Sequence, residues 1–227
     1  MNKCYILLII LCTLCLSCKE YNKKSKVDVL VATADSINAS ASYLQDKEEI
    51  QKLIRNVLNW SKSNTTFQLL PILTDSANNL YVGFDLKQLN KNLIILNETG
   101  LFSKAFVENY KQIILTLDKK VRNNEFDVWE IGNLPTFRFA NDVDPWSLCQ
   151  DVPYDNPNPC DFVEVRIIKL DKFNGEFDWK WGKLDHNQDS GWGDFVYRFK
   201  ATKENGKWKI SYLKGFDYTE SIRKDGV

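Results

Sequence analysis

The sequence predicts an α+β domain in which helices come first and an antiparallel sheet follows. Apolar residues recur at helical spacing as far as Leu117, whereas after Pro135 they alternate with polar residues, as in strands that bury one face. Helices and strands that are segregated along the chain in this way are typical of α+β proteins. We therefore expect three N-terminal helices packed on a bent antiparallel sheet of about four to five strands.

Three helices are predicted before Pro135. The first begins at Asp46, an acidic capping residue that is followed three positions later by a glutamate. The second ends at Gly100, because glycine commonly stops helices, and the third is capped by Ser103. The apolar faces of the three helices comprise Ile50, Leu53, Ile54, Val57 and Leu58, then Leu86, Leu89, Leu93 and Leu96, and finally Phe106, Tyr110, Ile113, Ile114 and Leu117.

Four amphipathic strands are predicted in the second half of the chain. A one-residue change of phase at Ile167-Ile168 predicts a β-bulge, after which Ile168 and Leu170 point inward. Asn205-Gly206 predicts a tight hairpin turn between the last two strands. The predicted strands are 163–170, 177–181, 195–201 and 207–212.

The N-terminal residues predict export from the cytoplasm. Lys3 is followed by an apolar segment from Tyr5 to Leu16, which is typical of a secretory signal and too short to favour a membrane-spanning helix. A small residue before Cys18 resembles the cleavage point of bacterial lipoproteins, although Cys15 stands where that class commonly has leucine. The resemblance implies that residues 1–17 are a signal peptide and that Cys18 carries the lipid. An ordinary cleaved signal and an uncleaved short anchor are the alternatives.

A lipid on Cys18 implies that the protein is anchored to the outer membrane of a bacterial cell envelope. Lys19-Glu20 resembles part of a signal that sends some lipoproteins to the cell surface, so the periplasmic face and the outer face both stay open. Roughly 210 residues remain after the signal, enough for one domain with its own core. We expect a lipidated cysteine and flexible tether over 18–45, the domain over 46–220 and a tail over 221–227.

Charge and motifs exclude several classes of function. Basic and acidic residues number 30 each, so no net field attracts the protein to nucleic acid. A Gly-rich phosphate loop, a nucleophile elbow and a His-Glu-x-x-His zinc motif are all missing from the sequence. We therefore predict neither a nucleic-acid partner nor a cofactor.

Two of the six cysteines fall in the predicted domain, and the others lie in the signal or at its cleavage point. An exported chain enters an oxidising compartment, which favours a disulfide between Cys149 and Cys160. A bridge over so short a loop would contribute roughly 2–3 kcal/mol to stability. A redox or metal-binding pair is the alternative, but Cys149 and Cys160 lack both the short Cys-x-x-Cys spacing and a nearby histidine.

Three short segments carry a resemblance to a known family. They are Leu101-Phe102-Ser103-Lys104-Ala105-Phe106, Asp144-Pro145-Trp146 with Gln150-Asp151, and Gly206-Lys207-Trp208-Lys209-Ile210. They resemble bacterial envelope proteins without an assigned function, which share the cone-shaped fold named after nuclear transport factor 2. The resemblance covers about Lys47 to Tyr218 and implies a concave pocket, and homodimers are common for this fold. Enzymes of that superfamily commonly use a His–Asp pair, whereas the single histidine here, His186, falls in a predicted hairpin loop.

One loop has the composition of a calcium site. Asp185, Asn187 and Asp189 place oxygen atoms at alternate positions, as calcium loops do. Val196 occupies the twelfth position, where a bidentate glutamate is expected. A polar hairpin explains the same residues, so we predict no metal and keep this loop as a weak candidate.

The loop that follows residue 140 is the first choice for a recognition surface. Asp142, Asp144 and Asp151 lie in it among several prolines, and their carboxylates either act as an acid–base pair or face water. Trp146 in this loop and Trp192 in another either anchor a ligand or pack against the rim of the domain. These five residues are the predicted binding candidates.

Together the features predict a membrane-anchored, non-catalytic binding module for a partner protein or a small ligand. An immunity-type protein that masks an incoming toxin is one version of this function. A hydrolase or isomerase that uses pocket carboxylates is the alternative. A pocket acid with a raised pKa would favour the enzyme, whereas a pocket filled by aromatic side chains would favour binding at the surface.

Overall fold

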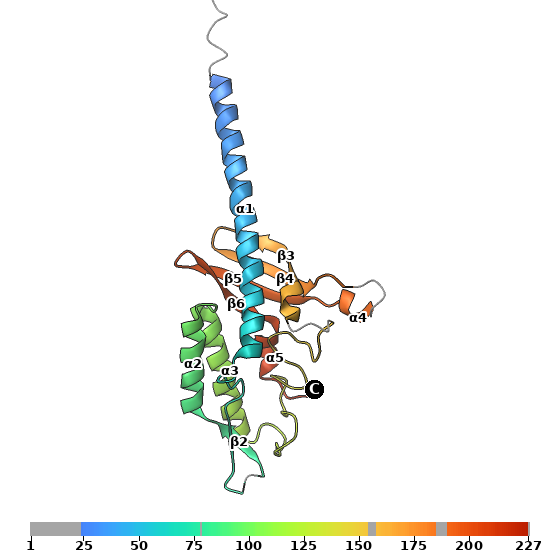
Figure 1. Ribbon diagram of the computed structural model, residues 1–227. Helices are drawn as coiled ribbons and strands as arrows, with labels where there is room; N and C mark the ends of the chain where they lie inside the picture. Colours follow the sequence, from blue (N-terminus) through green and yellow to red (C-terminus); the bar gives the residue numbers. More distant parts are fainter. Residues whose placement is uncertain (1–23, 78, 154–157, 185–189, 227) are drawn as a thin grey trace, which may run out of the picture. The chain divides into compact units, whose positions relative to one another are not determined.

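The protein is an α+β protein in the computed structural model, which describes residues 24–77, 79–153, 158–184 and 190–226, with the backbone only for 24–41 and 190. This part of the chain contains five α-helices and two antiparallel sheets (Figure 1). The helices are α1 (Lys24–Ser63), α2 (Leu86–Thr99), α3 (Lys104–Arg122), α4 (Ser190–Gly193) and α5 (Tyr218–Ser221), with short 3-10 helices at Pro159–Phe162 and Lys214–Phe216. The strands are β1 (Ile72–Thr74), β2 (Tyr81–Phe84), β3 (Val163–Leu170), β4 (Asn174–Trp181), β5 (Tyr197–Glu204) and β6 (Lys207–Leu213). Within these ranges no helix combines the length and apolar character needed to cross a membrane.

The chain divides into two compact units between Asp46 and Lys47. In the first unit the backbone is helical from Lys24 onward, where the sequence predicted a flexible tether over 18–45. Glycine and proline are both missing between Lys24 and Ser63, so the local sequence contains no residue that stops α1. The helix start predicted at Asp46 is therefore wrong, and the predicted helix is the second part of α1.

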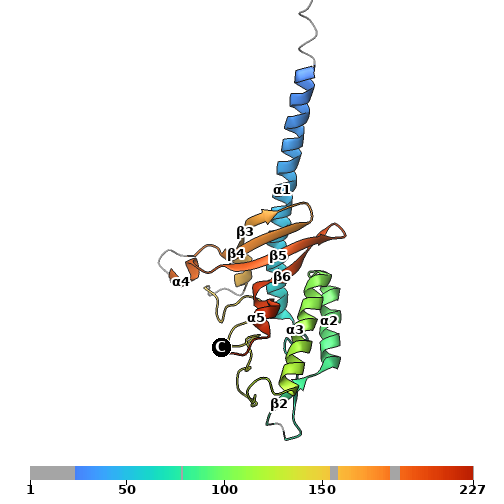
Figure 2. The same cartoon turned by 180° about the vertical axis from the view of Figure 1, so that it is seen from behind.

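The predicted ends of the next two helices are confirmed. Gly100 follows α2 in the left-handed conformation, with φ 68°, and Ser103 Oγ accepts the N–H of Phe106 at 3.2 Å at the start of α3. The start of α2 is capped by Asp85, whose carboxylate accepts the N–H of Lys87 at 2.8 Å. The two helices lie side by side in both views of the molecule (Figures 1 and 2).

The larger sheet is a meander with the strand order β3-β4-β5-β6, and it confirms the four predicted strands. The predicted bulge is confirmed as well, because the pairing of β3 with β4 shifts between Ile167 and Lys169. Ile168 is the extra residue at this shift and is 43% exposed, so the prediction that it points inward is wrong. The chain turns at Asn205-Gly206 between β5 and β6, as predicted.

Side chains of α1 cover the outer edge of β3. Gln51 accepts the N–H of Val165 at 2.9 Å and donates to the carbonyl of Val163 at 2.5 Å. Arg55 donates to the same carbonyl from Nε at 2.9 Å and from Nη2 at 2.8 Å. These bonds satisfy backbone groups that an open edge strand would offer to another chain.

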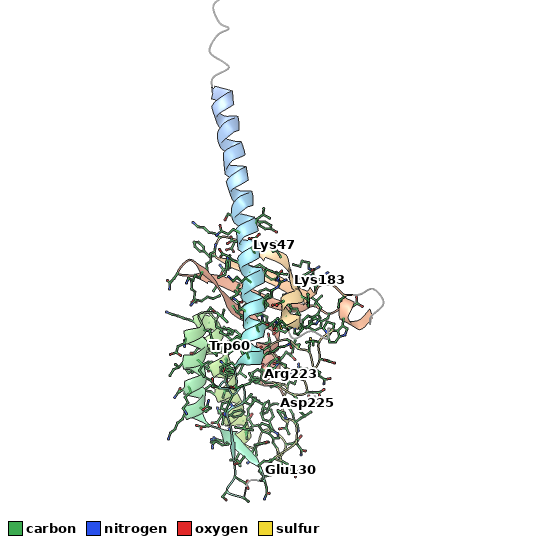
Figure 3. The ribbon with its side chains drawn as sticks, in the orientation of Figure 1. Lys47, Trp60, Glu130, Lys183, Arg223 and Asp225 are labelled. Atoms are coloured by element: carbon green, nitrogen blue, oxygen red, sulfur yellow. The ribbon has the colours of Figure 1, made fainter. Side chains whose placement is uncertain are left out.

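The smaller sheet is a hairpin that apolar periodicity did not predict, because β1 and β2 are only three and four residues long. An isolated bridge between Leu80 and Glu130 adds a third segment beside β2. β2 also contacts α3, and it lies at the lower end of that helix in Figure 1. Glu130 lies at the same end of the domain in Figure 3.

An aromatic cluster forms the centre of the core. Its members share ring contacts, with neighbouring ring centroids 4.5–6.1 Å apart. Trp60, at the C-terminal end of α1, can be located in Figure 3. The cluster comprises Trp60, Phe67, Phe102, Phe106, Trp146 and Phe216. Packed rings therefore fill the region around Trp146.

Candidate functional site

Trp146, predicted as a surface aromatic that could anchor a ligand, lies in the core. It is 4% exposed, and its ring centroid is 4.5 Å from that of Phe216 and 5.4 Å from that of Trp60. A buried indole is not available to stack on a ligand at the surface. Trp146 is therefore removed from the binding candidates, because packing against neighbouring rings uses its whole apolar surface.

Asp144 holds the turn that carries Trp146 inward. One carboxylate oxygen accepts the N–H of Trp146 and the other accepts the hydroxyl of Ser147, both at 3.2 Å. Burial raises the pKa of Asp144, against the opposing effect of these two hydrogen bonds and of Lys62. Since both oxygens have partners within the turn, the geometry supports a structural role for this carboxyl group.

Asp142 and Asp151 lie in the same loop, with exposed side chains. Asp142 has a left-handed backbone, with φ 63°, and its carbonyl accepts a hydrogen bond from Gln150 Nε2 at 2.9 Å. Ala140 and Leu148 also have positive φ values, of 55° and 53°. Non-glycine residues in this conformation are uncommon, so the loop has a specific backbone path that its own contacts maintain.

Cys149 and Cys160, predicted to form a disulfide, carry free thiols in the structure. Burial raises the pKa of Cys149 to about 11 and also raises that of Cys160. Both thiols lie within electrostatic range of Lys62 and Asp144, so the two cysteines share one neighbourhood. Protonated thiols are poor nucleophiles, which disfavours a catalytic role, and the disulfide stays a prediction.

Trp192 lies in α4 rather than in a loop. Its side chain is half-buried, and its ring meets that of Trp181 edge to face, with centroids 6.4 Å apart. Within the described ranges, no three His, Cys, Asp or Glu side chains are grouped so that they could hold a metal ion. The remaining site residues of the sequence analysis lie outside the described residues: Cys18, Asp185, His186, Asn187 and Asp189.

A surface cavity of about 440 Å³, which we name the Arg122 groove, lies beside β2 and the last turn of α3. Residues of the segment 124–129 also line it. Its volume falls in the range of small-molecule binding sites. The groove is lined by Leu80, Tyr81, Val82, Val121, Arg122, Asn124, Phe126, Asp127, Val128 and Trp129.

Most of the groove is apolar. The ring centroids of Tyr81 and Trp129 lie 4.3 Å apart, and Trp129 Nε1 donates to the carbonyl of Asn133 at 3.1 Å, so the indole has no free polar group. Val82 is 37% exposed and Val128 is 72% exposed, the highest value for a large hydrophobic side chain in the described ranges. Exposed apolar side chains that gather around a hollow indicate a binding surface.

Arg122 supplies the charge of the groove. Its Nε donates to both oxygens of Asp118, at 2.9 and 3.0 Å, and Asp118 Oδ1 also accepts the N–H of Phe84 at 2.7 Å. Gly83, with φ 148°, gives this pair its space, since a Cβ there would lie 2.7 Å from Asp118 Oδ1. The Nη1 and Nη2 atoms of Arg122 donate no hydrogen bond to any described residue, and 48% of the side chain is exposed.

Several other polar groups at the groove have partners. The carboxylate of Asp127 accepts Lys224 Nζ at 2.9 Å. Carbonyls in the last turn of α3 accept the backbone N–H groups of the residues that follow the helix. Asn123 donates to Lys119, Asn124 donates to Val121 and Glu125 donates to Lys120. This arrangement is a Schellman motif with Asn124 in the left-handed position, at φ 55°. Arg122 is therefore the charged group with spare donor capacity among the described residues that line the groove.

The sequence analysis missed this site because its walls come from distant parts of the chain. Val82 and Val128 belong to a short hairpin and to a segment without regular secondary structure. The one signal in the sequence was Val128-Trp129, an apolar pair between Asp127 and Glu130 outside any predicted element.

Comparisons of the chain with family models, with curated proteins and with solved structures give no match.

Proposed function

We propose that the protein is a lipid-anchored binding module of the bacterial cell envelope that takes up a small ligand in the Arg122 groove. The observation that carries this proposal is the groove, an apolar hollow with spare guanidinium donors in its wall. The filled core around Trp146 supports it, because packed aromatic rings leave no room for a ligand there. The anchor rests on the signal-like N-terminus and Cys18.

The finer description of the fold belongs to the same proposal. We infer a cone-shaped domain from the order of its elements, with α1, α2 and α3 before the four-stranded meander. The contact of α3 with β6 and the bridge between Phe102 and Ile210 support this packing. Both residues lie in segments that resemble the cone-shaped family of envelope proteins.

A partner protein is the second candidate, including a toxin in an immunity-type role. The observation that favours it is the loop that carries Asp142 and Asp151, which combines exposed acids with a specific backbone path. A partner held by this loop would be lost in Asp142→Lys or Asp151→Lys, whereas the ligand of the groove would be retained.

An enzyme that uses Asp144 is the alternative from another class, because burial raises the pKa of this carboxyl group toward that of a general acid. Its two hydrogen bonds within the turn argue against it. Asp144→Asn would abolish turnover in such an enzyme. In a binding module the same change would alter only stability.

Native mass spectrometry of the full chain, purified from membranes of its bacterial host, tests the main proposal. We expect a bound small molecule in the unaltered chain and its loss in Val128→Glu, which puts a charge at the rim of the groove. Ile94→Glu is the matched control, since Ile94 is 56% exposed on α2 and does not line the groove. The proposal is contradicted if no small molecule is bound to the unaltered chain, or if the same molecule is still bound to the Val128→Glu variant.

A further inference from the structure

We propose that the ligand of the Arg122 groove is a small amphiphilic carboxylate. Its apolar body would lie against Tyr81, Val82 and Val128, and its carboxylate would accept hydrogen bonds from Nη1 and Nη2 of Arg122. The inference rests on the proposed function, in which this groove is a binding site. It adds the chemical class of the ligand.

The guanidinium of Arg122 is oriented before any ligand arrives. Its Nε is bound to Asp118, which is itself held by the backbone N–H of Phe84. Asp118 thus fixes one side of the planar group and leaves the terminal nitrogens for another acceptor. Two N–H donors in a fixed plane match a carboxylate, which can accept both in parallel.

A cationic head group would find no unpaired carboxylate among the described residues that line the groove. The carboxylate of Asp127 is bound to Lys224, and the indole N–H of Trp129 is bound to Asn133. The carbonyls of Lys119, Lys120 and Val121 at the end of α3 accept backbone N–H groups. Arg122 has spare charged donors, and the carboxylate of Asp127 in the lining is paired with a lysine, so the charge of the groove favours an anion.

The walls restrict the body of the ligand to a small apolar group. Val82 and Val128 both line the cavity and expose aliphatic carbon, one from β2 and one from the segment 124–129. Trp129 is 4% exposed and packs against Tyr81, so it presents no open ring face on which a sugar could stack. A cavity of about 440 Å³ suits a molecule of small-ligand size.

Three probes with one apolar body and different head groups test the inference: 4-phenylbutyrate, 4-phenylbutan-1-ol and 4-phenylbutylamine. Each is titrated into the full chain and followed by isothermal titration calorimetry. We expect 4-phenylbutyrate to bind at least about tenfold more tightly than the alcohol, since a hydrogen bond to a charged group is worth about that factor. The amine should bind more weakly still.

Substitutions at Arg122 and Val128 test whether 4-phenylbutyrate binds in the Arg122 groove. Arg122→Gln should bring the affinity for 4-phenylbutyrate down to that for the alcohol, and Arg122→Lys should restore only part of the preference because it lacks the planar fork. Val128→Glu, at a highly exposed position that should not affect folding, should abolish binding of the butyrate, whereas Ile94→Glu should not.

Each contrary outcome has a distinct meaning. Equal binding of the butyrate and the alcohol overturns the inference about the head group but leaves the groove as a binding site. Binding of the butyrate that survives both Arg122→Gln and Val128→Glu overturns the assignment to the groove. No binding of any probe overturns the inference, while a bound natural ligand in the mass spectrum would still support the proposed function.

Discussion

The contribution of a tryptophan to stability depends on how deeply it is buried. Trp146 and Trp192 allow this to be tested at the scale of single residues. Trp146 contacts four phenylalanine rings and Trp60 in the centre of the core. Trp146→Ala should lower the free energy of unfolding by about 3–5 kcal/mol, because it removes buried aromatic surface and leaves a cavity. Trp192→Ala, at a half-buried site, should cost less, and urea denaturation measures both. Equal losses would contradict the placement of Trp146.

Asp178, in β4, allows a pH-dependent prediction. It is 2% exposed and accepts hydrogen bonds from Arg166 Nη2 at 2.5 Å and from Arg198 Nε at 2.7 Å. Burial opposes its ionisation, but the bonds from Arg198 and Arg166 outweigh burial and hold the pKa of Asp178 below its usual value of 3.8. A lowered pKa stabilises the fold above pH 3.8, and this stabilisation is lost as the pH falls through the folded-state pKa.

Asp178→Asn should therefore lower the free energy of unfolding by about 1–2 kcal/mol near neutral pH, where the carboxylate is ionised. The difference between the unaltered chain and Asp178→Asn should shrink below pH 3.8. Denaturation followed between neutral and acidic pH measures this. A difference that stays constant across the range would show that shape, rather than charge, makes Asp178 important.

At the scale of elements, local sequence predicted the features that local interactions decide. The stop at Gly100, the cap at Ser103 and the turn at Asn205-Gly206 are short-range signals, and the structure confirms all three. The hairpin of β1 and β2 was missed because its strands are too short to show alternation. The groove was missed for a related reason. In the sequence alone Arg122 is one of several basic residues in the last turn of a helix, and only the fold brings β2 beside it.

Gly83, in β2 of the hairpin, lies against Asp118 and Arg122 and allows a prediction about how this element supports the groove. Its φ of 148° disfavours any side chain, and a Cβ would collide with Asp118 and Arg122. Gly83→Ala should therefore cost more than the about 1 kcal/mol that a side chain costs at a positive φ with open space around it, and it should weaken binding of 4-phenylbutyrate by displacing Arg122.

Gly100→Ala is the matched control for this change. Gly100 also has a positive φ, but no atom lies within 4 Å of a Cβ built there. The control should lose about 1 kcal/mol of stability and keep its affinity for the probe. Denaturation and calorimetry on both variants give the comparison. If Gly83→Ala left the affinity for 4-phenylbutyrate unchanged, the hairpin would have no role in positioning Arg122 for binding.

At the scale of the whole molecule, the export prediction and the cysteine pair are linked. A chain that folds in an oxidising compartment should carry the Cys149–Cys160 disulfide, although burial keeps both thiols protonated in the reduced fold. Intact mass spectrometry should find the exported chain lighter by two hydrogen atoms than its reduced form. The reduced chain should oxidise faster when unfolded, because exchange requires the thiolate. A reduced pair in the exported protein would contradict the prediction.

The lipid anchor is the prediction on which location depends. If Cys18 carries the lipid, Cys18→Ala should move the protein from the membrane fraction to the soluble fraction and abolish incorporation of an alkyne-labelled palmitate. The attached acyl chains supply the membrane affinity, since a single chain binds only marginally and several on one cysteine hold stably. Cys15→Ala, in the same segment, is the matched control and should keep both the label and the membrane association. If Cys18→Ala stayed in the membrane without label, an uncleaved apolar segment would be the anchor.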